Sequence, residues 1–232
     1  MSMPTLQYCL EIFVLVSIVL NGAIILAILR FRRSNPFLKS SYFTLIIFHA
    51  SADLFLALEF TILMRLRKYR YLDFIIYEGS ALWVVLPRVT NGLHYYLKAV
   101  VYNGHILLSF NRFTSAFFPL TYETFWASKL MSVVRIVAWI LPAAFILPVV
   151  LNFNYSMWYS LSSSGTVRLE SDDVPTQLQS YMDGSLSLSA TVICLIFYIL
   201  TGFIISRHTL KNVGRYTQYS FKTMFRECNE AT

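Results

Sequence analysis

An apolar run over residues 10–29 constrains this chain more than any other feature. After Glu11 the run contains no charge, and Asn21 and Gly22 are its main interruptions. It reaches the roughly 20 residues that a helix needs to cross a bilayer. A cleavable signal peptide is not expected, because the run is long, no Lys or Arg precedes it, and a basic cluster from Arg30 follows it. The run therefore predicts an uncleaved membrane-spanning helix.

Four further segments have the length of spanning helices. Only 13% of the residues are charged, against roughly 25% in soluble domains, so an ordinary soluble fold is excluded. The predicted fold class is an all-α integral membrane protein, a five-span helical bundle formed by residues 1–232 as a single transmembrane domain. The spans are expected at about residues 10–29, 42–64, 86–110, 130–150 and 186–205.

The third of these segments, residues 86–110, is rich in polar residues. They follow steps of three and four along the chain: Asn91, His94, Lys98, Tyr102, His105, Ser109 and, just beyond the segment, Arg112. Such steps gather on one face of a helix, and charged groups in a membrane face the protein interior or water. We therefore expect this polar stripe to face the bundle, and the opposite face, with Leu97 and Ile106, to face lipid.

Basic residues predict the orientation, since they collect in cytoplasmic segments. With the N-terminus outside, eleven Lys and Arg residues fall in inner segments and five in outer ones. Residues 152–183 then form an outer loop and residues 206–232 a cytoplasmic tail, and the plasma membrane is the expected location. The basic loop after the second span, from Arg65 to Arg70, goes against this rule. In the outer loop, Asn154 begins an Asn-Tyr-Ser glycosylation acceptor.

The remaining composition excludes several classes of protein. The net charge of +7 follows from membrane topology, so nucleic acid is not an expected partner. The three cysteines, Cys9, Cys194 and Cys228, are too scattered to suggest a disulfide framework, and no metal-ligand spacing is present. No cofactor is expected. The motifs of hydrolases, metalloproteases and P-loop enzymes are absent, so the chain is not expected to be an enzyme.

The residues that follow the third span carry a resemblance to a known family. They read Asn111-Arg112-Phe113, then Phe118-Pro119, Tyr122 and Trp126. This stretch is similar to the signature of the nematode serpentine chemoreceptors, in particular class gamma (Srg) and the related Srv family, which resemble rhodopsin-type seven-helix receptors. Further marks of the resemblance are Asn21 in the first span, Asp53 in the second and Trp139 in the fourth.

The resemblance implies a chemosensory G-protein-coupled receptor with a small-molecule ligand and a heterotrimeric G protein as partners. Asn111, Arg112 and Pro119 would then lie at the switch that admits the G protein, although Asn111 replaces the usual acidic residue. Arg112 as an interfacial anchor is the alternative. Five spans instead of seven imply a receptor fold that is cut short. We expect such a chain not to activate a G protein alone and to be stable only in a receptor oligomer or beside a full-length relative.

Two buried polar residues are expected to share a hydrogen-bond network. Asn21 and Asp53 lie at similar depth in the first two spans, at ~1.5 Å of rise per residue. A carboxylate in hydrocarbon needs such partners or a proton. The alternative, that Asp53 only holds helices together, stays open.

The outer part of the polar stripe supplies the candidate ligand-binding residues: Asn91, His94, Tyr95, Lys98 and Tyr102. The Lys98 ammonium could hold a carboxylate or phosphate. The alternatives are that Lys98 pairs internally with Glu59 or Asp53, and that His94 is an ordinary hydrogen-bonded bundle residue. A transporter or channel subunit, or a non-signalling partner of a full-length receptor, is the alternative function, because intramembrane charges also mark ion pathways.

Overall fold

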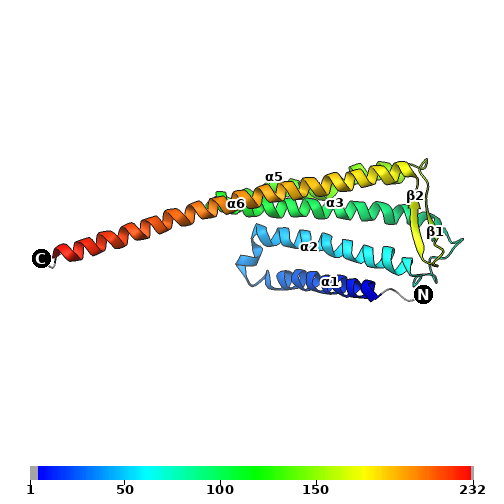
Figure 1. The fold of residues 1–232 in the computed structure, drawn as a ribbon, viewed down its shortest axis with the longest axis horizontal. Coiled ribbons are helices and arrows are strands. Elements are labelled where there is room, and N and C mark those ends of the chain that lie inside the picture. The colour runs from blue at the N-terminus through cyan, green and yellow to red at the C-terminus, as the bar shows by residue number, and fades with distance from the viewer. Residues whose placement is uncertain (1–4, 231–232) are drawn as a thin grey trace.

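The computed structural model describes the backbone of residues 5–230 and the side chains of residues 8, 9 and 11–207. Each predicted span lies within a helix (Figure 1). The long helices are α1 (Thr5–Phe31), α2 (Ser41–Glu59), α3 (Ala81–Phe117), α5 (Lys129–Leu151) and α6 (Asp173–Glu230). The short elements are η1 (Pro36–Lys39), a π-helical continuation of α2 named η2 (Phe60–Leu66), α4 (Tyr122–Ala127) and the strands β1 (Met157–Leu161) and β2 (Val167–Ser171).

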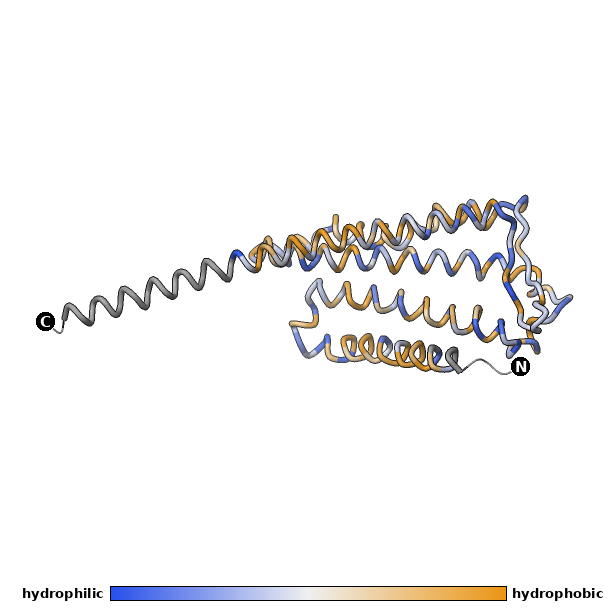
Figure 2. Tube along the Cα trace, in the orientation of Figure 1, coloured by the Kyte–Doolittle hydropathy of each residue, from blue (hydrophilic) through white to orange (hydrophobic). Residues whose placement is uncertain are grey.

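Four helices in the described part of the chain are long and apolar enough to cross a membrane. They cover Glu11–Phe31, Ser41–Leu66, Lys129–Leu151 and Asp173–Arg207. Their outward faces are apolar, and orange residues follow α1 and the part of α6 up to Arg207 in Figure 2. Phe13 on α1 and Phe203 on α6 are examples of large exposed side chains there. Such a surface fits lipid, not water.

The helix α3 is longer than predicted at both ends. It begins at Ala81 because the Ser80 side chain accepts a hydrogen bond from the Trp83 amide at 3.2 Å, an N-cap that satisfies one of the free amides of the first turn. It runs on to Phe117. With 37 residues, α3 is long enough to span, while its polar stripe keeps it less apolar than the other four.

The expectation for the apolar face of α3 is wrong in part. This helix lies between α2 on one side and α5 and α6 on the other (Figure 1). Leu97 is 4% exposed and Val100 2% exposed, and Val100 packs with Ala52 of α2 and Trp139 of α5. Because α3 is surrounded by three helices, these apolar positions form the protein core and do not face lipid.

The expected outer loop, residues 152–183, is largely ordered into secondary structure, which corrects the prediction. The strands β1 and β2 form an antiparallel hairpin with Tyr159 opposite Leu169, and Gly165 adopts a positive φ of 73° in its turn. The inner face of the hairpin packs Tyr159 and Val167 against Ile76. The last eleven residues of the expected loop, from Asp173, are already the first turns of α6.

Close packing between α3 and α5 requires a glycine at position 92. A Cβ atom there would lie 2.5 Å from a Val150 methyl carbon, whereas nothing lies within 4 Å of a Cβ placed at Gly202 of α6. Both Gly→Ala changes gain the same helix propensity. We therefore expect Gly92→Ala to be less stable than Gly202→Ala by about 1–3 kcal/mol, measured by circular dichroism during SDS titration in bicelles. Equal stabilities would contradict this packing.

Candidate functional site

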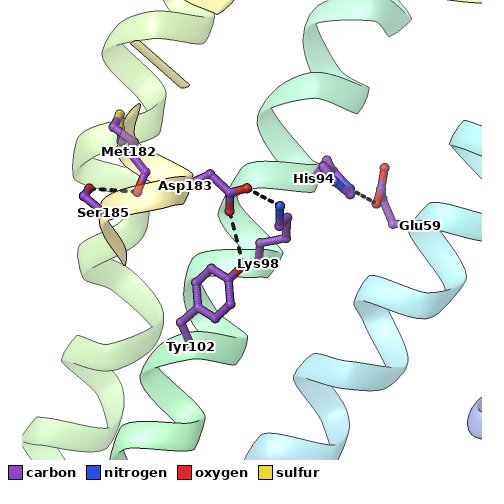
Figure 3. Close-up of polar contacts among 7 residues, drawn as sticks. All are labelled: Glu59, His94, Lys98, Tyr102, Met182, Asp183 and Ser185. Carbon is purple, nitrogen blue, oxygen red and sulfur yellow. Dashed lines mark hydrogen bonds and ion pairs between the residues drawn. The ribbon is translucent and has the colours of Figure 1, made fainter. Parts of the chain in front are cut away.

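The polar stripe of α3 makes contacts with two neighbouring helices (Figure 3). His94 Nδ1 lies 3.0 Å from the Glu59 carboxylate of α2. Lys98 donates to the Asp183 carboxylate of α6, which also accepts a hydrogen bond from the Tyr102 hydroxyl at 3.3 Å. These stripe residues thus point into the bundle and join α3 to both neighbours.

Two more stripe residues differ in how fully they are enclosed. Asn91 is buried and donates to Gln179 of α6 at 2.8 Å. The His105 ring lies 4.3 Å from the His49 ring of α2, centroid to centroid, yet His105 is exposed. The stripe is therefore enclosed at Asn91, exposed at His105 and buried again at Ser109, which is 2% exposed.

The partner of Lys98 was not among those expected from the sequence. Glu59 pairs with His94, and Asp53 lies 3.4 Å from His49 of its own helix. The predicted loop 152–183 includes Asp183, but α6 begins at Asp173 and carries Asp183 inside the helix. Gln179 and Asp183 are spaced by four residues, which places them on one helical face, and this spacing was the available signal.

Asn21 and Asp53, which are expected to share a hydrogen-bond network, do not bond to each other. The Asn21 amide donates to Ser17 at 3.3 Å within α1, and the Asp53 contact with His49 lies within α2. Both residues nevertheless line one hollow of about 430 Å³ between α1, α2 and α3. We call it the α1–α2–α3 groove, and its lining residues are Val14, Ser17, Asn21, Asp53, Leu56, Ala57, Phe60, His94 and Lys98.

The structure divides the candidate ligand-binding residues between two places. His94 and Lys98 line the α1–α2–α3 groove. Tyr95 lies on the other side of α3, beside a narrow enclosed cavity between α3, α5 and α6 that Gln179 and Asp183 also line. The Lys98–Asp183 ion pair therefore lies between the groove and this cavity.

The basic loop after α2 has internal partners that the sequence did not reveal. Arg65 lies 3.2 Å from Glu11 of α1, and Arg70 lies 2.6 Å from Asp73. The buried Arg67 guanidinium stacks 4.0 Å from the centre of the Tyr159 ring. Burial lowers the pKa of Arg67 and raises the pKa of Tyr159 from their usual values. These basic residues thus hold the hairpin end of the bundle together.

At the hairpin end of the bundle, Arg88 links α3 to the backbone at the end of α5. Its guanidinium donates to the backbone carbonyls of Val150 and Asn152, both at 3.1 Å, and to that of Tyr155. Val150 lies in the last turn of α5, and Asn152 and Tyr155 follow the helix, so these carbonyls have no helical partner. Asn154 lies in this segment with an exposed side chain.

The signature residues form a compact cluster at the opposite end of the bundle, where α4 lies. Asn111 is buried and exchanges hydrogen bonds with the Tyr122 hydroxyl, at 2.8 Å and 3.0 Å. Trp126 is completely buried and donates to Thr114 at 2.7 Å. These contacts fix α4 against α3. Burial raises the pKa of the Tyr122 hydroxyl above its usual value, although the bond to Asn111 acts in the opposite direction.

Arg112 and Pro119 lie at the surface of this end. An Arg112 nitrogen donates to the Tyr198 hydroxyl of α6 at 3.2 Å, and the guanidinium stays exposed. Pro119 lies in the exposed turn between α3 and α4. Arg112 also lines a hollow of about 710 Å³ together with Lys39, Tyr122 and Glu123.

Among the described residues, no group of three or more His, Cys, Asp or Glu side chains is arranged to hold a metal ion. Cys9 and Cys194 are free. Cys228, the third cysteine, lies outside the residues whose side chains are described.

Comparison with known proteins identifies the family. A family model described as "Srg family chemoreceptor" matches residues 8–224. "Serpentine receptor class V-1" of Caenorhabditis elegans is 25% identical over 207 residues, which cover 88% of this chain and 64% of the relative. The chain thus spans less than two thirds of the length of that curated relative. The resemblance to the Srg and Srv receptors is confirmed, and this multi-pass integral membrane protein belongs to the Srg family of chemoreceptors.

Proposed function

We propose that the chain acts as a chemosensory G-protein-coupled receptor in the plasma membrane, with a non-enzymatic role. A small molecule binds beside the polar stripe of α3, and a heterotrimeric G protein binds at the α4 end. The observation that carries this proposal is Lys98, a charged residue held inside the bundle between Asp183 and the α1–α2–α3 groove. Ionisable residues within a membrane are costly and mark functional sites.

The size and lining of the α1–α2–α3 groove support ligand binding. Its volume of about 430 Å³ falls in the usual range for small-molecule sites, which combine apolar walls with a few convergent polar groups. His94 and Lys98 offer such groups to a molecule in the groove. Asn91, Tyr95 and Tyr102 would respond indirectly, since they lie against α6 around Gln179 and Asp183.

Contacts between α3 and α6 can transmit a structural change from the ligand site to the G-protein end. The two helices are joined at Lys98 by Asp183 and again at Arg112 by Tyr198. These positions on α3 are fourteen residues apart, or ~21 Å at the helical rise. A ligand that alters the first contact would shift α6 beside Asn111, Arg112 and Pro119, the residues that we assign to the G-protein end.

Nucleotide exchange tests this function in membranes from cells that express a heterotrimeric G protein and the chain, either alone or beside a full-length relative that gives no response by itself. Since the chain is not expected to activate a G protein alone, the response is expected in the second membranes. At least one compound from a panel of small volatile and water-soluble molecules is expected to raise exchange. Lys98→Gln should abolish the response, and Leu195→Ala, which changes an exposed apolar residue of α6, should keep it. Compound-driven ion or substrate flux in liposomes, without any nucleotide exchange, would favour the transporter alternative.

The orientation that we propose has the N-terminus outside. It rests on the eleven-to-five distribution of basic residues. The internal partners of Arg65, Arg67 and Arg70 support it, because they give these outer residues a structural role.

An epitope at the N-terminus is expected to be labelled on intact cells, and one at the C-terminus only after permeabilisation. Asn154 should then lie outside, and a glycosidase should shift the electrophoretic mobility of the protein but not that of Asn154→Gln. Labelling of the C-terminal epitope on intact cells would reverse the orientation.

A further inference from the structure

The α1–α2–α3 groove is lined by one acidic and one basic side chain. The anion is Asp53 of α2, whose side chain is 31% exposed and whose described ion pair is a 3.4 Å contact with His49. The cation is Lys98 of α3. Glu59, the other carboxylate near the groove, is buried against His94 and is not part of the lining.

These two charges lie at nearly the same height in the bundle. His94 contacts Glu59, and Gly104 lies against His49, so α2 and α3 run antiparallel. By interpolation, Asp53 lies level with about residue 100 of α3. That is two residues from Lys98, or ~3 Å along the axis.

Apart from His94, which contacts Glu59, the rest of the groove is apolar or carries uncharged polar side chains. Val14, Leu56, Ala57 and Phe60 supply apolar surface, and Asn21 and Ser17 are already bonded to each other. A ligand with one charge would pair with one of the two ionic residues and leave the other with only its internal partner, His49 for Asp53 or Asp183 for Lys98. A ligand that carries both charges can satisfy both, and burying an unpaired charge is the costly alternative.

We propose that the ligand of this groove is a small zwitterion, such as a free amino acid with an apolar side chain. Its carboxylate binds Lys98, its ammonium group binds Asp53, and its side chain lies against Leu56 and Phe60. The inference rests on the proposed receptor function for its biological meaning, but binding itself can be measured separately.

Binding in this mode competes with an existing contact. Lys98 is held by Asp183, so the ligand carboxylate must draw the ammonium away from α6. Asp183 then keeps only the hydrogen bond from Tyr102 among its described side-chain contacts. Asp183 therefore acts as an internal competitor of the ligand, and its removal should strengthen binding.

Thermal stabilisation of the chain in nanodiscs tests the ligand class, because a ligand that binds the folded state raises its melting temperature. The probes are the free L-amino acids with apolar side chains, each with two analogues that lack one charge. For L-leucine these analogues are 4-methylpentanoate and 3-methylbutylamine. At least one amino acid is expected to stabilise the protein, with both of its analogues binding at least tenfold more weakly.

Two substitutions that break the same ion pair should have opposite effects. Lys98→Gln removes the partner of the ligand carboxylate and should weaken binding at least tenfold. Asp183→Asn removes the competitor and should tighten binding several-fold. Asp53→Asn should abolish the preference for the amino acid over its carboxylate analogue. Lys98→Gln and Asp183→Asn lose the same internal contact. A general loss of folding would therefore weaken ligand binding in both variants.

Several results would overturn the inference: no amino acid in the panel binds, one-charge analogues bind as well as the zwitterion, or Asp183→Asn weakens binding as Lys98→Gln does. Nucleotide exchange separates this outcome from the proposed function. Exchange driven by neutral compounds, without zwitterion binding, keeps the receptor and rejects the zwitterion. Zwitterion binding without exchange keeps the site and rejects the signalling role.

Discussion

Replacing Trp126 with alanine is expected to lower the free energy of unfolding by about 3–5 kcal/mol. This indole is 0% exposed and packs with Leu45 of α2 and Met131 of α5. Its nitrogen donates to Thr114 of α3 at 2.7 Å. The substitution leaves a cavity where α2, α3, α4 and α5 meet. The measurement is SDS-induced unfolding in bicelles, followed by far-ultraviolet circular dichroism.

Trp126→Phe is the matched control. It keeps most of the apolar volume and loses the hydrogen bond to Thr114, so a loss of about 1–3 kcal/mol is expected. Phe125→Ala, on the adjacent but exposed ring, should cost much less than Trp126→Ala. If Trp126→Ala were no more harmful than Phe125→Ala, the indole would not be the centre of this junction, and its place in the family signature would need a functional explanation.

Replacing Lys98 with methionine is expected to destabilise the folded chain by roughly 3 kcal/mol, at the low end of the range for breaking a buried ion pair. The low end applies because the Lys98 and Asp183 side chains are 25% and 26% exposed. Methionine keeps much of the length of the lysine chain but leaves the Asp183 carboxylate without its cation inside the bundle. The same detergent titration measures the loss.

The double variant Lys98→Met with Asp183→Met is expected to recover most of this stability, because two apolar groups leave no buried charge unpaired. The difference between the double variant and the sum of the single variants measures the coupling between the two side chains. Additive losses would mean that the two groups do not interact, and would place the cost of Lys98→Met in its packing with α3 neighbours.

Hydropathy predicted the helical segments well because the bilayer acts on each residue almost independently. About 20 apolar residues are needed to cross it whatever the fold around them, so 10–29 and 130–150 could be located without tertiary information. The helix over 86–110 was located by a different signal, the three-and-four spacing of Asn91, His94 and Lys98. This spacing requires only the geometry of one helix.

The hairpin has a local sequence signal that hydropathy does not capture. Val167-Arg168-Leu169-Glu170 alternates apolar and polar residues, a pattern that favours a strand. The start of α6 at Asp173 was harder to predict, since polar and apolar residues are mixed over 173–183. These residues are helical in the structure, where Gln179 and Asp183 form hydrogen bonds with α3.

The sequence by itself determined that this chain is an all-α membrane protein of the serpentine chemoreceptor type, and that α3 has a polar face directed into the bundle. Only the tertiary structure decided which groups pair: Asp183 and not Asp53 with Lys98, Glu59 with His94, and Tyr159 with Arg67. The physical reason is that the free energy of transfer into a bilayer depends on single residues and single helices. The partner of a charge depends on how neighbouring helices cross, and on where a helix begins, which the local sequence does not specify.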